Sequence, residues 1–192
     1  MAVSSTMLPL GTKAPDFSLT DTMSGRVVSL GDLTAKAVVV MFICNHCPYV
    51  KLVRDGLAAF GRDYADADVD IVAISANDAE AYPDDAPDQL AAIAREAGYT
   101  FPVLYDETQE VAKAYTAACT PDFFVFDESR SLVYRGQFDD ARPNAGTPVT
   151  GKDLRAAVDA VLAGETPSPD QRPSIGCSIK WRAGNEPAYF GG

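Results

Sequence analysis

The sequence lacks any apolar run near the ~20 residues that a membrane-spanning helix needs. Residues 1–15 contain neither a basic segment nor an apolar core, so no secretory signal is visible and we expect a cytoplasmic protein. Basic residues are also scarce, since 16 Lys and Arg stand against 27 Asp and Glu and leave a net charge of -11. This charge repels a phosphate backbone, so we expect neither a nucleic-acid partner nor a membrane partner.

Cysteine and histidine are few: the 192 residues contain four Cys and one His. Four cysteines are too few for a disulfide scaffold in a chain of this length, and closely spaced cysteines in a reducing compartment are more often catalytic or metal-binding. A structural zinc site needs four ligands, and only Cys44 and Cys47 form a Cys-x-x-Cys pair. We therefore expect no metal and no bound cofactor.

The rest of the composition is that of an ordinary globular protein, 47% hydrophobic and 22% charged. This length suits a single domain with a full core. We expect one domain over residues 1–192, with a core at about 10–163. From residue 164 the chain is rich in Pro and Gly without periodicity, which predicts an irregular tail, 164–192, packing on that core.

The most informative stretch is 37–50. Residues 37–43 form an unbroken apolar run rich in β-branched side chains, typical of a strand buried on both faces. Cys44-Asn-His-Cys47 follows at once, and the apolar spacing after Pro48 predicts an amphipathic helix ending near Asp68. A thiolate at a helix N-terminus faces unpaired N–H groups and the positive end of the helix dipole. The pattern therefore indicates a redox-active pair of thiols.

The remaining segments predict the elements around this junction. Residues 17–30 read as a β-hairpin, and 69–75 as a second buried strand that completes a right-handed, parallel strand–helix–strand unit. The segment 77–87 reads as a solvated loop, with Asp85 or Asp88 starting the next helix. Further strands are predicted at 101–105, 122–127 and 131–138, and helices at 89–97, 109–117 and 150–163.

Three motifs together resemble the thioredoxin-fold superfamily: Gly11-x-x-Ala-Pro-Asp-Phe17, the Cys-x-x-Cys after a core strand, and Thr120-Pro121 before a late strand. Within it the chain is most similar to the peroxiredoxin-like branch of alkyl hydroperoxide reductase and thiol-specific antioxidant proteins. The stretches 44–50, 134–140 and 176–181 resemble its redoxin-domain sub-group, and the resemblance covers about residues 10–182.

The resemblance implies an α/β protein with the thioredoxin fold, a central mixed β-sheet flanked by helices, and an N-terminal β-hairpin extension. It also implies that Pro121 is cis and faces the two cysteines. Thr120 would then offer backbone groups with which a substrate chain can pair, so Thr120 and Pro121 are the expected substrate-binding residues.

The chain departs from the active-site sequence patterns of both thioredoxins and peroxiredoxins. Thioredoxins carry a buried acid six residues before the first cysteine, where this sequence has Val38. Peroxiredoxins carry Pro-x-x-x-Thr-x-x-Cys, and aligning their cysteine on Cys47 puts Cys44 where the Thr belongs; aligning it on Cys44 puts Met41 there. Neither register supplies the hydroxyl that polarises a peroxide, so efficient peroxidase activity is not expected.

We expect Cys44 to be the exposed nucleophile and Cys47, one helical turn further, to be the thiol that resolves a mixed disulfide. Asn45 and His46 are the expected modulating residues, because an imidazolium near Cys44 would stabilise its thiolate. The alternative for His46 is a solvent-facing spacer.

The two further cysteines each allow two interpretations. Cys119 precedes Thr120-Pro121 and is either an additional redox thiol or a small buried hydrophobic residue. Cys177 lies in the tail and is either a third redox thiol that attacks the Cys44 intermediate or a packing residue.

The sequence thus predicts a thiol–disulfide oxidoreductase. Its substrates would be a disulfide-bearing protein, a small thiol or a peroxide, and its reductant an external system such as thioredoxin or glutathione. A peroxiredoxin-like thiol peroxidase and a non-catalytic redox sensor or binding module of the same fold are the alternatives.

Overall fold

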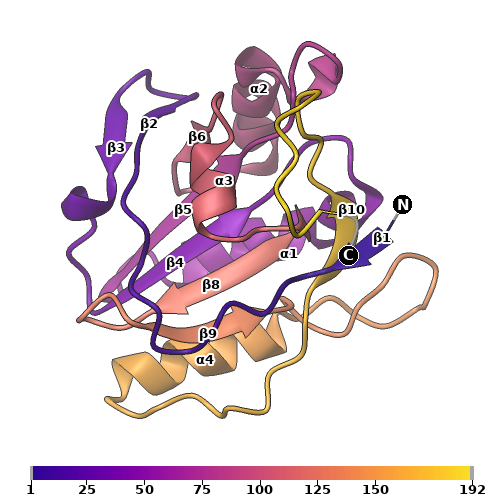
Figure 1. Ribbon diagram of the computed structural model, residues 1–192. Helices are drawn as coiled ribbons and strands as arrows, with labels where there is room; N and C mark the ends of the chain where they lie inside the picture. The colour runs from indigo at the N-terminus through magenta and orange to yellow at the C-terminus, as the bar shows by residue number, and fades with distance from the viewer. Residues whose placement is uncertain (1, 191–192) are drawn as a thin grey trace.

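Residues 2–190 are described by the computed structural model of the chain (Figure 1). Its strands are β1 (Ala2–Ser4), β2 (Ser18–Asp21), β3 (Val27–Ser29), β4 (Ala37–Phe42), β5 (Val69–Ser75), β6 (Val103–Tyr105), β7 (Cys119–Thr120), β8 (Asp122–Phe126), β9 (Leu132–Gly136) and β10 (Ile175–Ser178). Its α-helices are α1 (Pro48–Asp63), α2 (Pro87–Ala97), α3 (Glu110–Ala114) and α4 (Lys152–Leu162), with short 3₁₀ helices η1 (Leu30–Asp32) and η2 (Pro83–Asp85).

Seven strands form the central sheet, in the order β3-β2-β6-β5-β4-β8-β9. β4 pairs in parallel with β5 and antiparallel with β8, and β5 pairs in parallel with β6. β2 and β3 form the expected N-terminal hairpin. The expected mixed sheet with a hairpin extension is therefore present.

β4 explains the apolar run because all six of its residues are buried. Val39 and Met41 enter a cluster with side chains of α1, α2 and α4, and Val40 enters a second cluster with side chains of α3. Figure 1 shows α1 and α3 on opposite sides of the sheet. This two-faced burial fixes the position at which the chain leaves β4, two residues before Cys44.

α1 begins where the sequence predicted it, with Pro48 in its first turn, but it ends at Asp63 and not near Asp68. The shorter helix has a packing reason. Val69 pairs with Ala37 at the start of β4, so residues 64–68 are needed to turn the chain back into β5. None of the helices within residues 2–190 is both long and apolar enough to span a membrane.

The expectation of an irregular tail is wrong in one segment. Ile175–Ser178 forms β10, which pairs antiparallel with β1 on one side and with β7 on the other. Beyond it, Ile179 and Trp181 are buried in the cluster on the α3 side of the sheet. A strand of four residues is too short to show a clear alternation of apolar and polar side chains. Its formation depends on the strands with which it pairs.

Candidate active site

Cys44 and Cys47 lie between the end of β4 and the start of α1, where the sequence placed them. Cys47 is the residue that caps α1, immediately before Pro48. The expectation that Cys44 is exposed is wrong, because Cys44 is 2% exposed and Cys47 is fully buried. Both sulfurs are covered by segments distant in sequence.

Thr120 and Pro121 are one of these segments, and the bond between them is cis, as the resemblance implied. The Thr120 hydroxyl lies 3.2 Å from Cys44 Sγ. The Cys47 thiol donates to the backbone oxygen of Thr120, also at 3.2 Å. One residue therefore contacts both sulfurs, and it places beside Cys44 a hydroxyl that the local sequence lacks.

Asp85 is a site residue that sequence reasoning missed. It lies in η2 and is fully buried, so the expectation of a solvated loop with Asp85 or Asp88 starting the helix is wrong at this position; α2 begins at Pro87. Its carboxylate accepts from the Asn45 backbone N–H at 2.6 Å and from the Asn77 side-chain amide at 2.8 Å. The bond to Asn45 fixes the backbone between the two cysteines, and the bond to Asn77 fixes the Asp85 carboxylate itself.

His46 also turns toward Asp85. Its Nδ1 lies 2.5 Å from Asp85 Oδ2, and its ring stacks on Tyr82 at 5.4 Å between centroids. The imidazole is 22% exposed, so it is neither a free spacer nor a buried core residue. Asn45 extends the same contact, because its side-chain amide donates to the Asp84 backbone oxygen at 2.8 Å.

Cys44, His46 and Asp85 offer a sulfur, a nitrogen and an oxygen that all lie within 4.8 Å of one another. Such a set could hold a metal ion, which the sequence did not predict. Both Asp85 oxygens, however, already accept hydrogen bonds from protein groups. Hydrogen bonding alone therefore accounts for the burial of this carboxylate.

The two thiols are electrostatically coupled. The hydrogen bond between them, burial and the Asp85 charge raise the pKa of Cys44, while the Thr120 hydroxyl opposes this rise. The same hydrogen bond lowers the pKa of Cys47 against the effect of burial. The pair therefore gives up one proton readily and holds the second, which favours a monoanion shared by the two sulfurs.

Cys119 is fully buried on β7, and its thiol donates to the Pro121 backbone oxygen at 3.7 Å. Burial and the neighbouring Asp122 charge raise its pKa well above the ordinary value. Asp122 itself is buried directly after Pro121 and is a second internal acid that the sequence did not single out. Cys119 thus has the surroundings of an inert thiol.

Cys177 lies directly opposite Thr120 in the pairing of β10 with β7. It is partly exposed and packs against the cluster that contains Cys44 and Cys47. The backbone edge of Thr120, which the resemblance assigned to a substrate chain, is therefore filled by the tail of the same chain.

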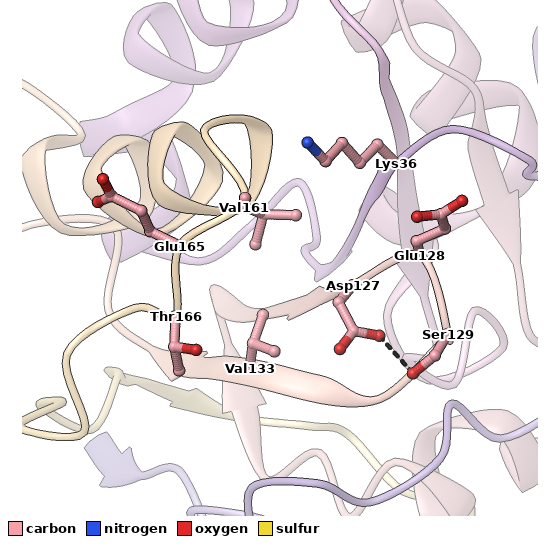
Figure 2. A pocket seen from close by; sticks show the side chains of 9 residues that line it. Lys36, Asp127, Glu128, Ser129, Val133, Val161, Glu165 and Thr166 are labelled. Atoms are coloured by element: carbon pink, nitrogen blue, oxygen red, sulfur yellow. Dashed lines mark hydrogen bonds between the residues drawn. The ribbon is translucent and has the colours of Figure 1, made fainter.

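A cavity of about 450 Å³ lies away from these residues (Figure 2). Its wall mixes Lys36 with Asp127, Glu128 and Glu165. Lys36 directly precedes β4, whereas Cys44 follows it, so the cavity and the cysteines lie at opposite ends of that strand. It is separate from the site formed by the two cysteines.

Comparison with known proteins places the chain among relatives of similar sequence and fold. The model of the AhpC/TSA family matches residues 10–135. The crystal structure of an uncharacterized conserved protein from Geobacillus kaustophilus is 57% identical, with coverage of 95% of this chain and 97% of that chain and a TM-score of 0.93. A hypothetical protein from Sinorhizobium meliloti 1021 is 52% identical, with coverage of 94% and 99% and a TM-score of 0.92.

The thioredoxin-like protein YneN of Bacillus subtilis (strain 168) is 30% identical over 118 residues, which are 62% of this chain and 65% of that protein. Solved structures under 25% identical, thiol–disulfide oxidoreductases among them, share the fold alone, at TM-scores of 0.58 to 0.64. The fold is the thioredoxin fold, as expected. The chain belongs to the AhpC/TSA family.

Proposed function

We propose that the chain is a thiol–disulfide oxidoreductase that cycles Cys44 and Cys47 between dithiol and disulfide, with Cys44 as the nucleophile. The contact of both sulfurs with Thr120, each at 3.2 Å, carries the proposal. It places the two thiols side by side at the N-terminus of α1, where negative charge is stabilised.

The hydrogen bond between the two thiols favours the negative charge on Cys47, because it raises the pKa of Cys44 and lowers that of Cys47. The partners outside the pair favour the charge on Cys44, and the assignment of the nucleophile rests on them, because the hydroxyl beside Cys44 can donate to a thiolate. The partner of Cys47 is a carbonyl oxygen, which can only accept. As Cys44 attacks a substrate disulfide, the proton of the monoanionic pair stays on Cys47, whose thiol donates to Thr120. One substrate sulfur leaves as a thiolate.

Cys47 then gives its proton to the substrate thiolate that has left and attacks Cys44 Sγ in the mixed disulfide. The Cys44–Cys47 bond forms, the second substrate sulfur leaves, and two electrons have passed from the protein to the substrate. An external thiol system, such as thioredoxin or glutathione, would return the pair to the dithiol.

The test is trapping with oxidised glutathione in the variants Cys44→Ser and Cys47→Ser, with Cys119→Ser as the matched control. We expect a stable glutathione adduct on Cys44 in the Cys47→Ser protein, read by mass spectrometry, and full turnover in the control. An adduct that forms only on Cys47 would reverse the two roles, and no adduct on either cysteine would reject disulfide exchange.

A thiol peroxidase is the second candidate, favoured by the Thr120 hydroxyl beside Cys44. Cys44 would be oxidised to a sulfenic acid as the peroxide is reduced to an alcohol or water, and Cys47 would condense with it to a disulfide and release water. Peroxide treatment of the same variants distinguishes the candidates. Rapid sulfenic acid on Cys44, with no turnover of disulfides, would support the peroxidase.

A further inference from the structure

The tail strand β10 fills the edge of β7 beside the reactive sulfurs, and Figure 1 shows it running next to β1. In this pairing Cys177 is opposite Thr120, and Ser178 is opposite Cys119. An extended substrate that bound by strand addition would use this same edge. The tail therefore occupies the place of a substrate chain, and the residue that it brings to the centre of that place is a cysteine.

The direction of the Cys177 side chain follows from the same register. Residues directly opposite each other in an antiparallel pair project from the same face of the sheet, with Cβ atoms roughly 5 Å apart. The Thr120 side chain points at the Cys44 sulfur. Cys177 therefore projects toward the two reactive sulfurs, and it packs against the cluster that contains them.

Of the two reactive cysteines, Cys47 is the one bonded to the backbone of the strand with which β10 pairs. Its thiol bonds to the Thr120 backbone oxygen. The proximity of the Cys47 and Cys177 thiols also lowers the pKa of Cys47 and contributes, after burial, to the raised pKa of Cys177. Cys44 has no such link, since its neighbours are Cys47, Thr120 and Asp85.

Contacts at Gly176 and on either side of it fix the position of β10 beside Thr120. A Cβ atom on Gly176 would lie 2.0 Å from the Thr120 backbone oxygen, so only glycine permits this approach of the two strands. Ser174 is tied to Ser5 by two hydrogen bonds of 3.0 Å on one side of Gly176. On the other side, Ile179 is 2% exposed and its N–H bonds to Ala118.

We infer that Cys177 is a third redox thiol, carried on β10 as a built-in substrate strand, and that it exchanges with Cys47. The inference rests on the proposed function, because it needs the Cys44–Cys47 disulfide as its starting point. It also limits the substrates: while β10 is docked, the strand edge is closed to peptides, and small disulfides are the substrates that the site accepts.

The step is an isomerisation without net oxidation. The Cys177 thiolate attacks Cys47 Sγ, the Cys44–Cys47 bond breaks, the Cys47–Cys177 bond forms, and Cys44 leaves as the thiolate and takes up the proton that Cys177 lost. An external dithiol can then attack the partly exposed Cys177. It is oxidised to its own disulfide as Cys47 and Cys177 return to thiols.

Tryptic fragments make the test unambiguous. Cys44 and Cys47 share the fragment 37–51, Cys119 lies in 114–130, and Cys177 lies in 156–180, because the Arg172-Pro173 bond resists trypsin. The full-length protein and its variants are oxidised with diamide, alkylated and digested, and the fragments are weighed. In the Cys44→Ser variant we expect fragments 37–51 and 156–180 to be joined through Cys47 and Cys177.

Three controls separate a redox role from simple proximity. Added to Cys44→Ser, the Cys119→Ser change should leave the joined fragments intact, and Cys177→Ser should abolish them. As a single change, Cys177→Ser should still allow the Cys44–Cys47 disulfide to form. Gly176→Ala added to Cys44→Ser should also remove the joined fragments although Cys47 and Cys177 are both present, because the added methyl pushes β10 from Thr120. Circular dichroism verifies that this variant is folded.

The two proposals fail in different ways. If diamide forms Cys44–Cys47 in the unaltered protein but never Cys47–Cys177 in Cys44→Ser, the inference is overturned and the proposed function stands. If Cys44–Cys47 does not form either, the proposed function fails as well. A joined fragment that survives at full yield when Gly176→Ala is added to Cys44→Ser would show that the register of β10 does not control the exchange.

Discussion

At the scale of single residues, the site depends on two polar side chains that come from outside the Cys-x-x-Cys segment. Thr120 touches both sulfurs, and Asp85 binds the backbone and the histidine between them. They act in opposite directions on Cys44, since the Thr120 hydroxyl lowers its pKa and the Asp85 charge raises it. Substitution of either residue should therefore shift the pKa of Cys44 in a predictable direction.

Replacing Asp85 with Asn should lower the pKa of Cys44, because a negative charge near the thiolate is removed. Alkylation of Cys44 by iodoacetamide, measured against pH in a Cys47→Ser background, should begin at lower pH. The free energy of unfolding in urea should fall by about 1–3 kcal/mol, since an amide cannot accept all the hydrogen bonds that the carboxylate accepts. Asp84→Asn is the control because Asp84 is exposed; equal alkylation curves for both variants would contradict the assignment.

Replacing Thr120 with Val should raise the pKa of Cys44 further and slow disulfide exchange. A hydrogen bond to a charged group is worth about 1.5–3 kcal/mol, which corresponds to a rate loss of roughly ten- to hundred-fold. The rate of reduction of oxidised glutathione measures the effect. Thr120→Ser keeps the hydroxyl and should stay near the unaltered rate, so equal losses in both variants would argue for packing instead.

Among the elements, β4 and α1 are consecutive in the chain and form one wall of the site, whereas the second wall comes from segments distant in the sequence. β7 and β10 form that wall, and each is short. β10 depends on buried anchors beyond it, because Ile179 and Trp181 fix the tail in the core on the α3 side.

Ile179→Ala should therefore loosen β10 as well as the core. Truncating a buried Ile costs about 2–5 kcal/mol of unfolding free energy, which urea denaturation measures. Alkylation of Cys177 in the folded protein should also become faster as β10 leaves Thr120. The control is Ile175→Ala on the same strand, where the side chain is 36% exposed and the expected loss is within about 0.5 kcal/mol. Unchanged Cys177 reactivity in Ile179→Ala would mean that β10 is held by its strand pairing alone.

At the scale of the whole molecule, the buried Asp122 links stability to pH. Burial raises the pKa of this carboxyl well above its ordinary value. The folded chain therefore binds a proton that the unfolded chain releases at about pH 3.9. Between the unfolded and the folded pKa, stability falls as pH rises, by up to about 1.4 kcal/mol per pH unit.

Asp122→Asn removes this dependence. We expect the free energy of unfolding of the variant to fall less steeply than that of the unaltered protein as pH rises from 4 to 8. Urea denaturation across that range measures both curves. The exposed Asp66→Asn change should leave the slope as it was. Parallel curves for Asp122→Asn and the unaltered protein would show that Asp122 ionises without cost.

The strand–helix junction that carries Cys44 and Cys47 could be predicted from the sequence alone, as could the class of fold. A strand buried on both faces has to be continuously apolar, and a helix packed on the core has to be apolar on one side. The pattern of apolar residues in 37–60 therefore predicts both elements. The hairpin and most strands follow from the same local periodicity. These features could be predicted because each depends on neighbours close in the chain.

The surroundings of the two sulfurs depend on contacts between segments that are distant in the sequence. Asp85 and Asn45 are 40 positions apart, and Thr120 and Cys44 are 76 positions apart. A polar residue in a loop has the same local pattern whether it faces water or a thiol, so nothing in 77–87 marks Asp85 as a site residue. The burial of Cys44 and the pairing of Cys177 with Thr120 likewise depend on segments that come together only in the folded chain. The periodicity of apolar residues does not indicate such long-range contacts.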